Sequence, residues 1–105
     1  MNGYDIDGVI TIGVRPKKGD VVITGRTIDF YEETKDLEID VPIYFNPYHH
    51  TIEDAGRWKA EMIQKLGIEK FYEDDLTQIK IIKLIYPKAK IIRIYQPPKR
   101  RIEND

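Results

Sequence analysis

The chain has 105 residues, enough for one compact domain with a buried core but too few for two. A hydrophobic fraction of 41% predicts a folded chain, and a formal net charge of -1 excludes a general attraction to nucleic acid. The absence of cysteine excludes disulfide bonds, thiolate metal sites and cysteine nucleophiles.

Four short segments rich in β-branched and aromatic residues predict strands, at residues 21–24, 41–45, 70–73 and 89–95. "GYDI" at residues 3–6 would supply a further strand at the start. The length and composition of the four segments are typical of strands buried in the core of a sheet.

Three helices are predicted between these strands. Residues 27–38 contain helix formers and few breakers, which predicts a helix of about three turns. Residues 57–68 give the clearest helical pattern, in which Gly67 is the C-terminal stop. Residues 76–87 interleave polar with apolar side chains and end at a proline, which favours a helix there too.

The start of the middle helix is open between two positions. Thr51 followed by Asp54 resembles a capping box, which would begin the helix at residue 52. Gly56 weakens any helix that runs through it, which favours a later start capped by Asp54.

The alternation of strands and helices implies right-handed crossovers and a mostly parallel sheet covered on both faces. We therefore expect an α/β fold over residues 1–96, a three-layer Rossmann-like fold with a five-stranded sheet. Residues 97–105, which include "PPKRR", are expected to form a basic and polar C-terminal tail. No apolar run reaches 18 residues and no signal peptide is visible, so we expect a cytoplasmic protein without a membrane partner.

Polar residues stand at the carboxyl ends of the predicted strands, where open parallel sheets bind ligands. Asp5 and Asp7 are two residues apart, so their carboxylates would lie on one side of an extended segment. With Asp74 or Asp75 they would form a strongly negative pocket of hard oxygen ligands, which suits Mg²⁺. One aspartate of the first pair could attack phosphorus while the other protonates the leaving oxygen and then activates water.

Further groups would complete a site for phosphoryl chemistry. The Thr24 hydroxyl and the Gly25 amide are placed to donate hydrogen bonds to phosphate, the amide at the start of a helix. Lys59 would offset the negative charge of the nucleophile and the phosphate, provided that its helix starts near Gly56 and places Lys59 in the first turn.

The segments "YDIDGVIT", "VVITGRT", "RWKAEMIQKLGI" and "KFYEDDLTQIKII" resemble, in order and spacing, the four motifs of the haloacid dehalogenase-like (HAD) superfamily. The last segment is similar to the phosphatase domains of bacteriophage polynucleotide kinases. The resemblance implies Asp5 as nucleophile, Asp7 as general acid and base, and Lys59 as the stabilising lysine. It implies Thr24, Gly25 and Arg26 at the substrate phosphate, and Mg²⁺ held by Asp5, the backbone carbonyl of Asp7, and Asp74 and Asp75.

The short spacing between the motifs leaves no room for a cap domain. Only sixteen residues separate Asp7 from Thr24, so residues 9–20 are expected to form a flap or a hairpin. The leading hypothesis is a capless, Mg²⁺-dependent phosphomonoester phosphatase whose open site admits a phosphorylated small molecule or a nucleic acid end. The alternative is a non-catalytic binding or adaptor protein with the same fold, for a phosphorylated or nucleic acid partner. The sequence does not specify the oligomeric state.

Overall fold

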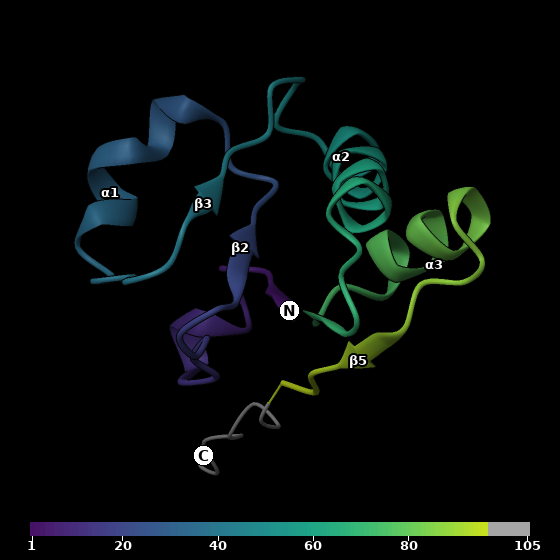
Figure 1. Cartoon of the computed structure of the whole chain (residues 1–105). Helices are drawn as coiled ribbons and strands as arrows, with labels where there is room; N and C mark the ends of the chain where they lie inside the picture. The colour runs from purple at the N-terminus through teal and green to yellow at the C-terminus, as the bar shows by residue number, and fades with distance from the viewer. Residues whose placement is uncertain (97–105) are drawn as a thin grey trace, which may run out of the picture.

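A computed structural model describes residues 1–96 of the chain, and the predicted tail at residues 97–105 lies outside the described residues. Strands and helices alternate as the sequence predicts (Figure 1). In chain order the elements are β1 (Gly3–Tyr4), η1 (Ile10–Ile12), β2 (Val21–Ile23), η2 (Ile28–Phe30), α1 (Tyr31–Lys35), β3 (Ile43–Tyr44), α2 (Ile52–Leu66), β4 (Phe71–Glu73), α3 (Leu76–Ile85) and β5 (Ile91–Arg93), where η denotes a 3₁₀ helix.

The five strands form one sheet in the order β3-β2-β1-β4-β5, and every neighbouring pair is parallel. Helices α2 and α3 lie side by side against one face, over a buried cluster that includes Ile23, Ile63 and Phe71 (Figure 1). The opposite face is covered by the segment around η1 and by residues 37–41, which pack on Tyr4 and Val22. The predicted three-layer α/β Rossmann-like fold without a cap is confirmed.

The central strand β1 is only two residues long, yet both of its residues are buried and paired on both sides. The Asp5 amide extends this pairing by donating to the carbonyl of Tyr72 at 3.0 Å. Gly3 permits the close approach of β4, because a Cβ at this position would lie 2.9 Å from Phe71 Cδ1. The start of the chain therefore holds Asp5 firmly, despite its few residues.

The expected helix over residues 27–38 is wrong in its extent. The chain forms the 3₁₀ turn η2 and then five residues of α-helix, and Glu38 has a left-handed φ of 53° that ends any further helix. The apolar side chains of Leu37 and Ile39 turn instead into the core beneath the sheet. Burial of these side chains outweighs the helix propensity of the segment.

Helix α2 takes the earlier of the two starts left open by its sequence. The Thr51 hydroxyl accepts the Asp54 amide at 3.1 Å as N-cap, and Gly67 ends the helix in a left-handed conformation with φ 65°. Gly56 lies inside the helix because α3 packs there: a Cβ would come within 2.9 Å of Ile81 Cγ2. Close helix packing therefore explains a glycine that the sequence pattern interpreted as a weak point.

Helix α3 is confirmed and ends at Ile85, shortly before Pro87, because the residue that precedes a proline is kept out of the helical region. Residues 9–20 contain the 3₁₀ turn η1 and an irregular loop; the hairpin alternative is not formed, since no strand lies in this segment. Across residues 1–96, no helix is long and apolar enough to cross a membrane.

Candidate functional site

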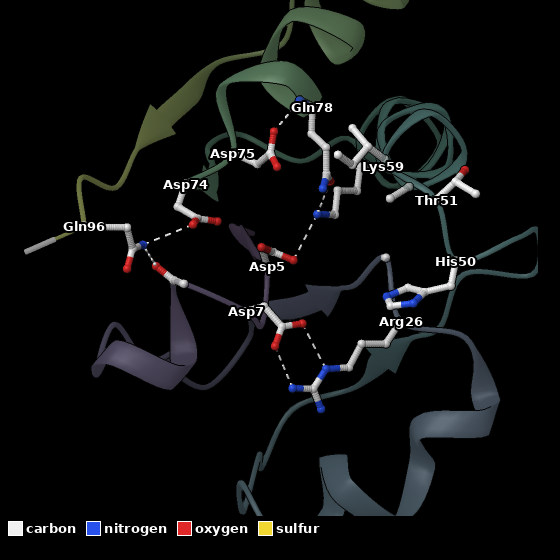
Figure 2. Close-up of a pocket in the computed structure, with 14 residues that line it drawn as sticks. Asp5, Asp7, Arg26, His50, Thr51, Lys59, Asp74, Asp75, Gln78 and Gln96 are labelled. Carbon is white, nitrogen blue, oxygen red and sulfur yellow. Dashed lines mark hydrogen bonds and ion pairs between the residues drawn. The ribbon is translucent and has the colours of Figure 1, made fainter. Parts of the chain in front are cut away.

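A cavity of about 510 Å³ lies at the carboxyl ends of the central strands (Figure 2). Its walls come from the loops after β1, β2, β4 and β5, from the first two turns of α2 and the residues before it, and from the first turn of α3. It is lined by Asp5, Asp7, Gly8, Gly25, Arg26, His50, Thr51, Ile52, Ala55, Lys59, Asp74, Asp75, Gln78 and Gln96. Seven of the eight candidate site residues therefore reach one cavity, as the position of ligand sites in parallel sheets predicts.

Lys59 lies at the base of this cavity with only 1% of its side chain exposed. Its ammonium donates to Asp5 Oδ1 at 2.9 Å and to Gln78 Oε1 at 2.6 Å (Figure 2). It also donates to Glu73 Oε1 at 2.6 Å. The expected place of Lys59 in the first turn is wrong, because α2 begins at Ile52 and Lys59 lies in its second turn. Its long side chain spans the added distance to the strand ends.

Burial by itself would lower the pKa of Lys59, but the nearby charges of Asp5 and Glu73 raise it instead. Burial raises the pKa of Glu73 well above its usual range, and the charge of Asp5 acts in the same direction. Lys59 opposes this shift through its charge and hydrogen bond. The ammonium is thus fixed as a cation between two buried carboxyl groups.

Three carboxyl groups gather beside Lys59, and only two of them, Asp5 and Asp74, have a role predicted from the sequence. Single oxygen atoms of Asp5, Glu73 and Asp74 all lie within 4.8 Å of one another. Glu73 is fully buried and also accepts the amides of Asp74 and Asp75, at 3.1 and 3.2 Å. The sequence of β4 already indicates that Glu73 is buried, because every second side chain of a strand lies on the same face and Phe71 belongs to the core.

This cluster fits a divalent cation with a preference for oxygen ligands. Asp5 accepts Lys59 through Oδ1 and Asp74 accepts Gln96 through Oδ2, which leaves the second oxygen of each for a cation, whereas both oxygens of Glu73 accept hydrogen bonds from the protein. Mg²⁺ commonly takes one or two carboxylates and completes its shell with water and phosphate oxygens. Asp5 and Asp74 are the residues that would hold the cation. Glu73 would keep the Lys59 ammonium and the Asp74 backbone in position beside it.

Asp75, predicted beside Asp74 at the metal, has a structural role. Its carboxylate accepts the Gln78 amide at 3.0 Å as the N-cap of α3, although the side chain still lines the cavity. Burial raises the pKa of Asp74, helped by the charge of Asp5. The two neighbouring aspartates therefore have different environments, and only Asp74 belongs to the acidic cluster.

Asp7 lies in a turn that follows β1, so the expected extended geometry for Asp5 and Asp7 is wrong. The Asp7 carboxylate receives two hydrogen bonds from Arg26, from Nη2 at 2.7 Å and from Nε at 3.0 Å (Figure 2). These bonds hold the pKa of Asp7 below its usual range. Arg26 in turn donates to the Thr34 hydroxyl at 2.9 Å, which anchors the guanidinium to α1.

Thr24 and Gly25 depart from their expected roles in different ways. The Thr24 side chain is fully buried, does not line the cavity, and accepts the Arg26 amide at 3.0 Å. Gly25 lines the cavity but does not begin a helix, since η2 starts at Ile28. Its lack of a side chain permits contact with α2, because a Cβ would lie 2.6 Å from Ala55 Cβ.

Two further residues stabilise the loop after β1. Gln96 donates from Nε2 to the Gly8 carbonyl at 2.9 Å and to Asp74 Oδ2 at 3.1 Å (Figure 2). Gly8 has a φ of 82°, and a Cβ there would overlap the Asp74 carboxylate. No local pattern in the sequence points to Gln96, because the contact joins residues 88 positions apart.

Comparisons of the chain with models of known protein families, with curated proteins and with solved structures found no match.

Proposed function

We propose that the chain is a Mg²⁺-dependent phosphatase that hydrolyses phosphomonoesters through an aspartyl-phosphate on Asp5. One observation carries the proposal: Asp5 directly follows the central strand, lines the cavity, and is paired with the buried cation of Lys59. A carboxylate beside a fixed cation and an acidic cluster is suited to a phosphate ester, which brings negative charge of its own. The motif resemblance to the HAD superfamily supports the same chemistry.

In the first step an oxygen of Asp5 attacks phosphorus, and the bond from phosphorus to the leaving oxygen breaks. Lys59 stabilises the charge that gathers on the attacking carboxylate and the phosphoryl oxygens. Asp7 delivers the proton that converts the leaving oxygen to an alcohol. The products of this step are the free alcohol and phosphorylated Asp5.

In the second step a water molecule attacks phosphorus and gives a proton to Asp7. The bond between Asp5 and phosphorus breaks, which releases inorganic phosphate and restores both carboxyl groups. Mg²⁺ bound at Asp5 and Asp74 would supply neutralisation of the phosphoryl charge.

Asp7 cannot donate a proton while Arg26 holds it as a carboxylate. A phosphate that reaches Arg26 competes for the same guanidinium donors, because both anions match its forked geometry. Substrate binding therefore frees Asp7, which takes up a proton from solvent before the first step and loses that proton again when it pairs with Arg26 after phosphate leaves. Thr34 keeps Arg26 in place during this exchange.

The test is the hydrolysis of p-nitrophenyl phosphate by the full chain, with Mg²⁺ and after its removal with EDTA. Asp5→Asn is compared with Asp36→Asn, an exposed aspartate at the end of α1 and outside the cavity. We expect turnover that requires both Mg²⁺ and Asp5 and is unchanged in D36N. Beryllium trifluoride should also bind to Asp5, which ¹⁹F NMR detects in the wild type and not in D5N.

Hydrolysis that continues without Mg²⁺ or in D5N would overturn the proposal. If no phosphomonoester is turned over while inorganic phosphate still binds and requires Arg26, the non-catalytic binding protein is favoured instead. Calorimetric titration of phosphate into the wild type and Arg26→Gln distinguishes these outcomes.

A further inference from the structure

An aromatic wall, formed by Phe30 and His50, adjoins the cavity on the side of Asp7. The two rings are in contact, with centroids 4.7 Å apart and planes tilted by 52°. They line a second hollow of about 550 Å³ together with Glu33, and this hollow shares Asp7, Arg26, His50 and Gln78 with the main cavity. Figure 2 shows His50 on the same side of the site as the pair of Asp7 and Arg26.

We propose that the aromatic wall binds a planar aromatic ring carried by the leaving group of the substrate. This inference rests on the proposed function, in which Asp7 protonates the leaving oxygen. The leaving group must then lie next to Asp7, and the hollow beyond Asp7 is the one that Phe30 and His50 line. Aromatic side chains bind flat rings by stacking and by edge-to-face contact.

The core does not explain the position of Phe30. It is half-buried and belongs to neither of the two buried apolar clusters of residues 1–96, although Leu37 and Ile39 of the same crossover pack there. Because its ring touches His50, the two side chains leave no slot between them, and both line the hollow. A ligand ring would therefore pack against the wall from the cavity.

Polar groups beside the wall match the edge of a nucleobase. The Lys59 ammonium can only donate, so it fixes the Gln78 amide with its oxygen toward Lys59 and its NH₂ group away. Within residues 1–96 that NH₂ group has no hydrogen-bond acceptor, and the Glu33 carboxylate lines the same hollow. A nucleobase offers both acceptors and donors to such groups, whereas a simple aryl ring would use the wall alone.

The kinetic test compares benzyl phosphate with cyclohexylmethyl phosphate, whose leaving groups are both primary alcohols and differ in the aromatic ring. We expect a higher kcat/KM for benzyl phosphate, and a decrease of this preference by about 3- to 10-fold in Phe30→Leu. Tyr31→Leu is the matched control, because Tyr31 follows Phe30 but pairs with Phe45 and lines a different hollow. Adenosine 3′-monophosphate and a 3′-phosphorylated oligonucleotide, both compared with benzyl phosphate, distinguish a nucleobase from a simple aryl group.

A second measurement does not depend on turnover. The chain has only two histidines, so the ring signals of His49 and His50 are resolved by NMR and assigned with His49→Gln. Adenosine should shift the His50 signal in the wild type, and ribose should leave it unchanged. The shift should decrease in F30L and persist in Y31L.

The two proposals fail in different ways. Hydrolysis with equal kcat/KM for both esters and no shift of His50 would leave the phosphatase intact and overturn the aromatic wall. A shift of His50 by adenosine, without hydrolysis of any phosphomonoester, would overturn the phosphatase and support binding of a ring at this wall. A preference for benzyl phosphate that F30L and Y31L reduce equally would also overturn the wall.

Discussion

Arg26 forms a bidentate ion pair with Asp7, in which Nη2 lies 2.7 Å from Oδ1 and Nε lies 3.0 Å from Oδ2. The residues come from the loops after two neighbouring strands, β1 and β2. The pair holds the proposed acid of the first step in its ionised form. An anion that draws Arg26 away would therefore also change the protonation of Asp7.

The first prediction concerns the pKa of Asp7. In Arg26→Gln the hydrogen bonds that lower this pKa are lost, so it should rise toward the ordinary value for aspartate. Folding lowers the pKa of Asp7, so the ion pair stabilises the folded state at any pH above the ordinary pKa of aspartate. This stabilisation is lost as the pH falls through the lowered pKa of the folded state. Carboxyl ¹³C NMR titration measures the shift. Arg15→Gln, which removes an arginine bonded to the Glu38 carbonyl, is the control, and an unchanged Asp7 pKa in R26Q would contradict the prediction.

The second prediction concerns the stability that Lys59 provides. Lys59→Met leaves the carboxyl groups of Asp5 and Glu73 buried without their cation, which should lower the free energy of unfolding by about 3–5 kcal/mol. Urea denaturation measures this loss. Replacing Glu73 by Gln in the same chain removes one of the two repelling acids and should restore part of the stability. A double variant no more stable than K59M would argue against repulsion as the cause.

The third prediction separates backbone strain from crowding at Gly8. Gly8→Ala places a methyl group onto the Asp74 carboxylate at a φ of 82°, so it should destabilise the fold by about 2–4 kcal/mol. Gly13→Ala is the matched control, because Gly13 has a φ of 104° with no atom within 4 Å of its Cβ position. That variant should lose only about 1–2 kcal/mol. Thermal unfolding followed by circular dichroism compares the two, and equal losses would exclude a role for the contact with Asp74.

The fourth prediction assigns the metal-site acid. Mg²⁺ in 100-fold excess over its Kd should stabilise the wild type by about 2.7 kcal/mol, because it binds the folded state. Asp74→Asn should lose this stabilisation, since Asp74 belongs to the acidic cluster with Asp5 and Glu73. Asp75→Asn should keep it, because asparagine is as good an N-cap as aspartate. The midpoint of thermal unfolding with and without Mg²⁺ is the measurement, and the reverse pattern would identify Asp75 as the ligand.

Local patterns in the sequence were sufficient to predict most of the fold. Short apolar segments with β-branched or aromatic residues predict the strands, and the chain order of strands and helices predicts the parallel sheet. Gly67 marks the end of α2, and Thr51 is one of the two N-caps that the sequence leaves open, since capping is a contact between near neighbours. Ligand sites in parallel sheets lie at the carboxyl ends of the strands, which is where Asp5 and Asp74 follow two neighbouring strands and meet at one cavity.

Only the tertiary structure decided which side chains pair inside that cavity. Lys59 reaches Asp5 from 54 residues away, and Gln96 reaches Gly8 from 88 residues away. Spacing predicts the face of a strand or helix on which a side chain lies, but burial and distance from other elements determine its partner. For this reason Glu73 enters the acidic cluster, Asp7 binds Arg26, and Thr24 is buried beneath the site that it was expected to line.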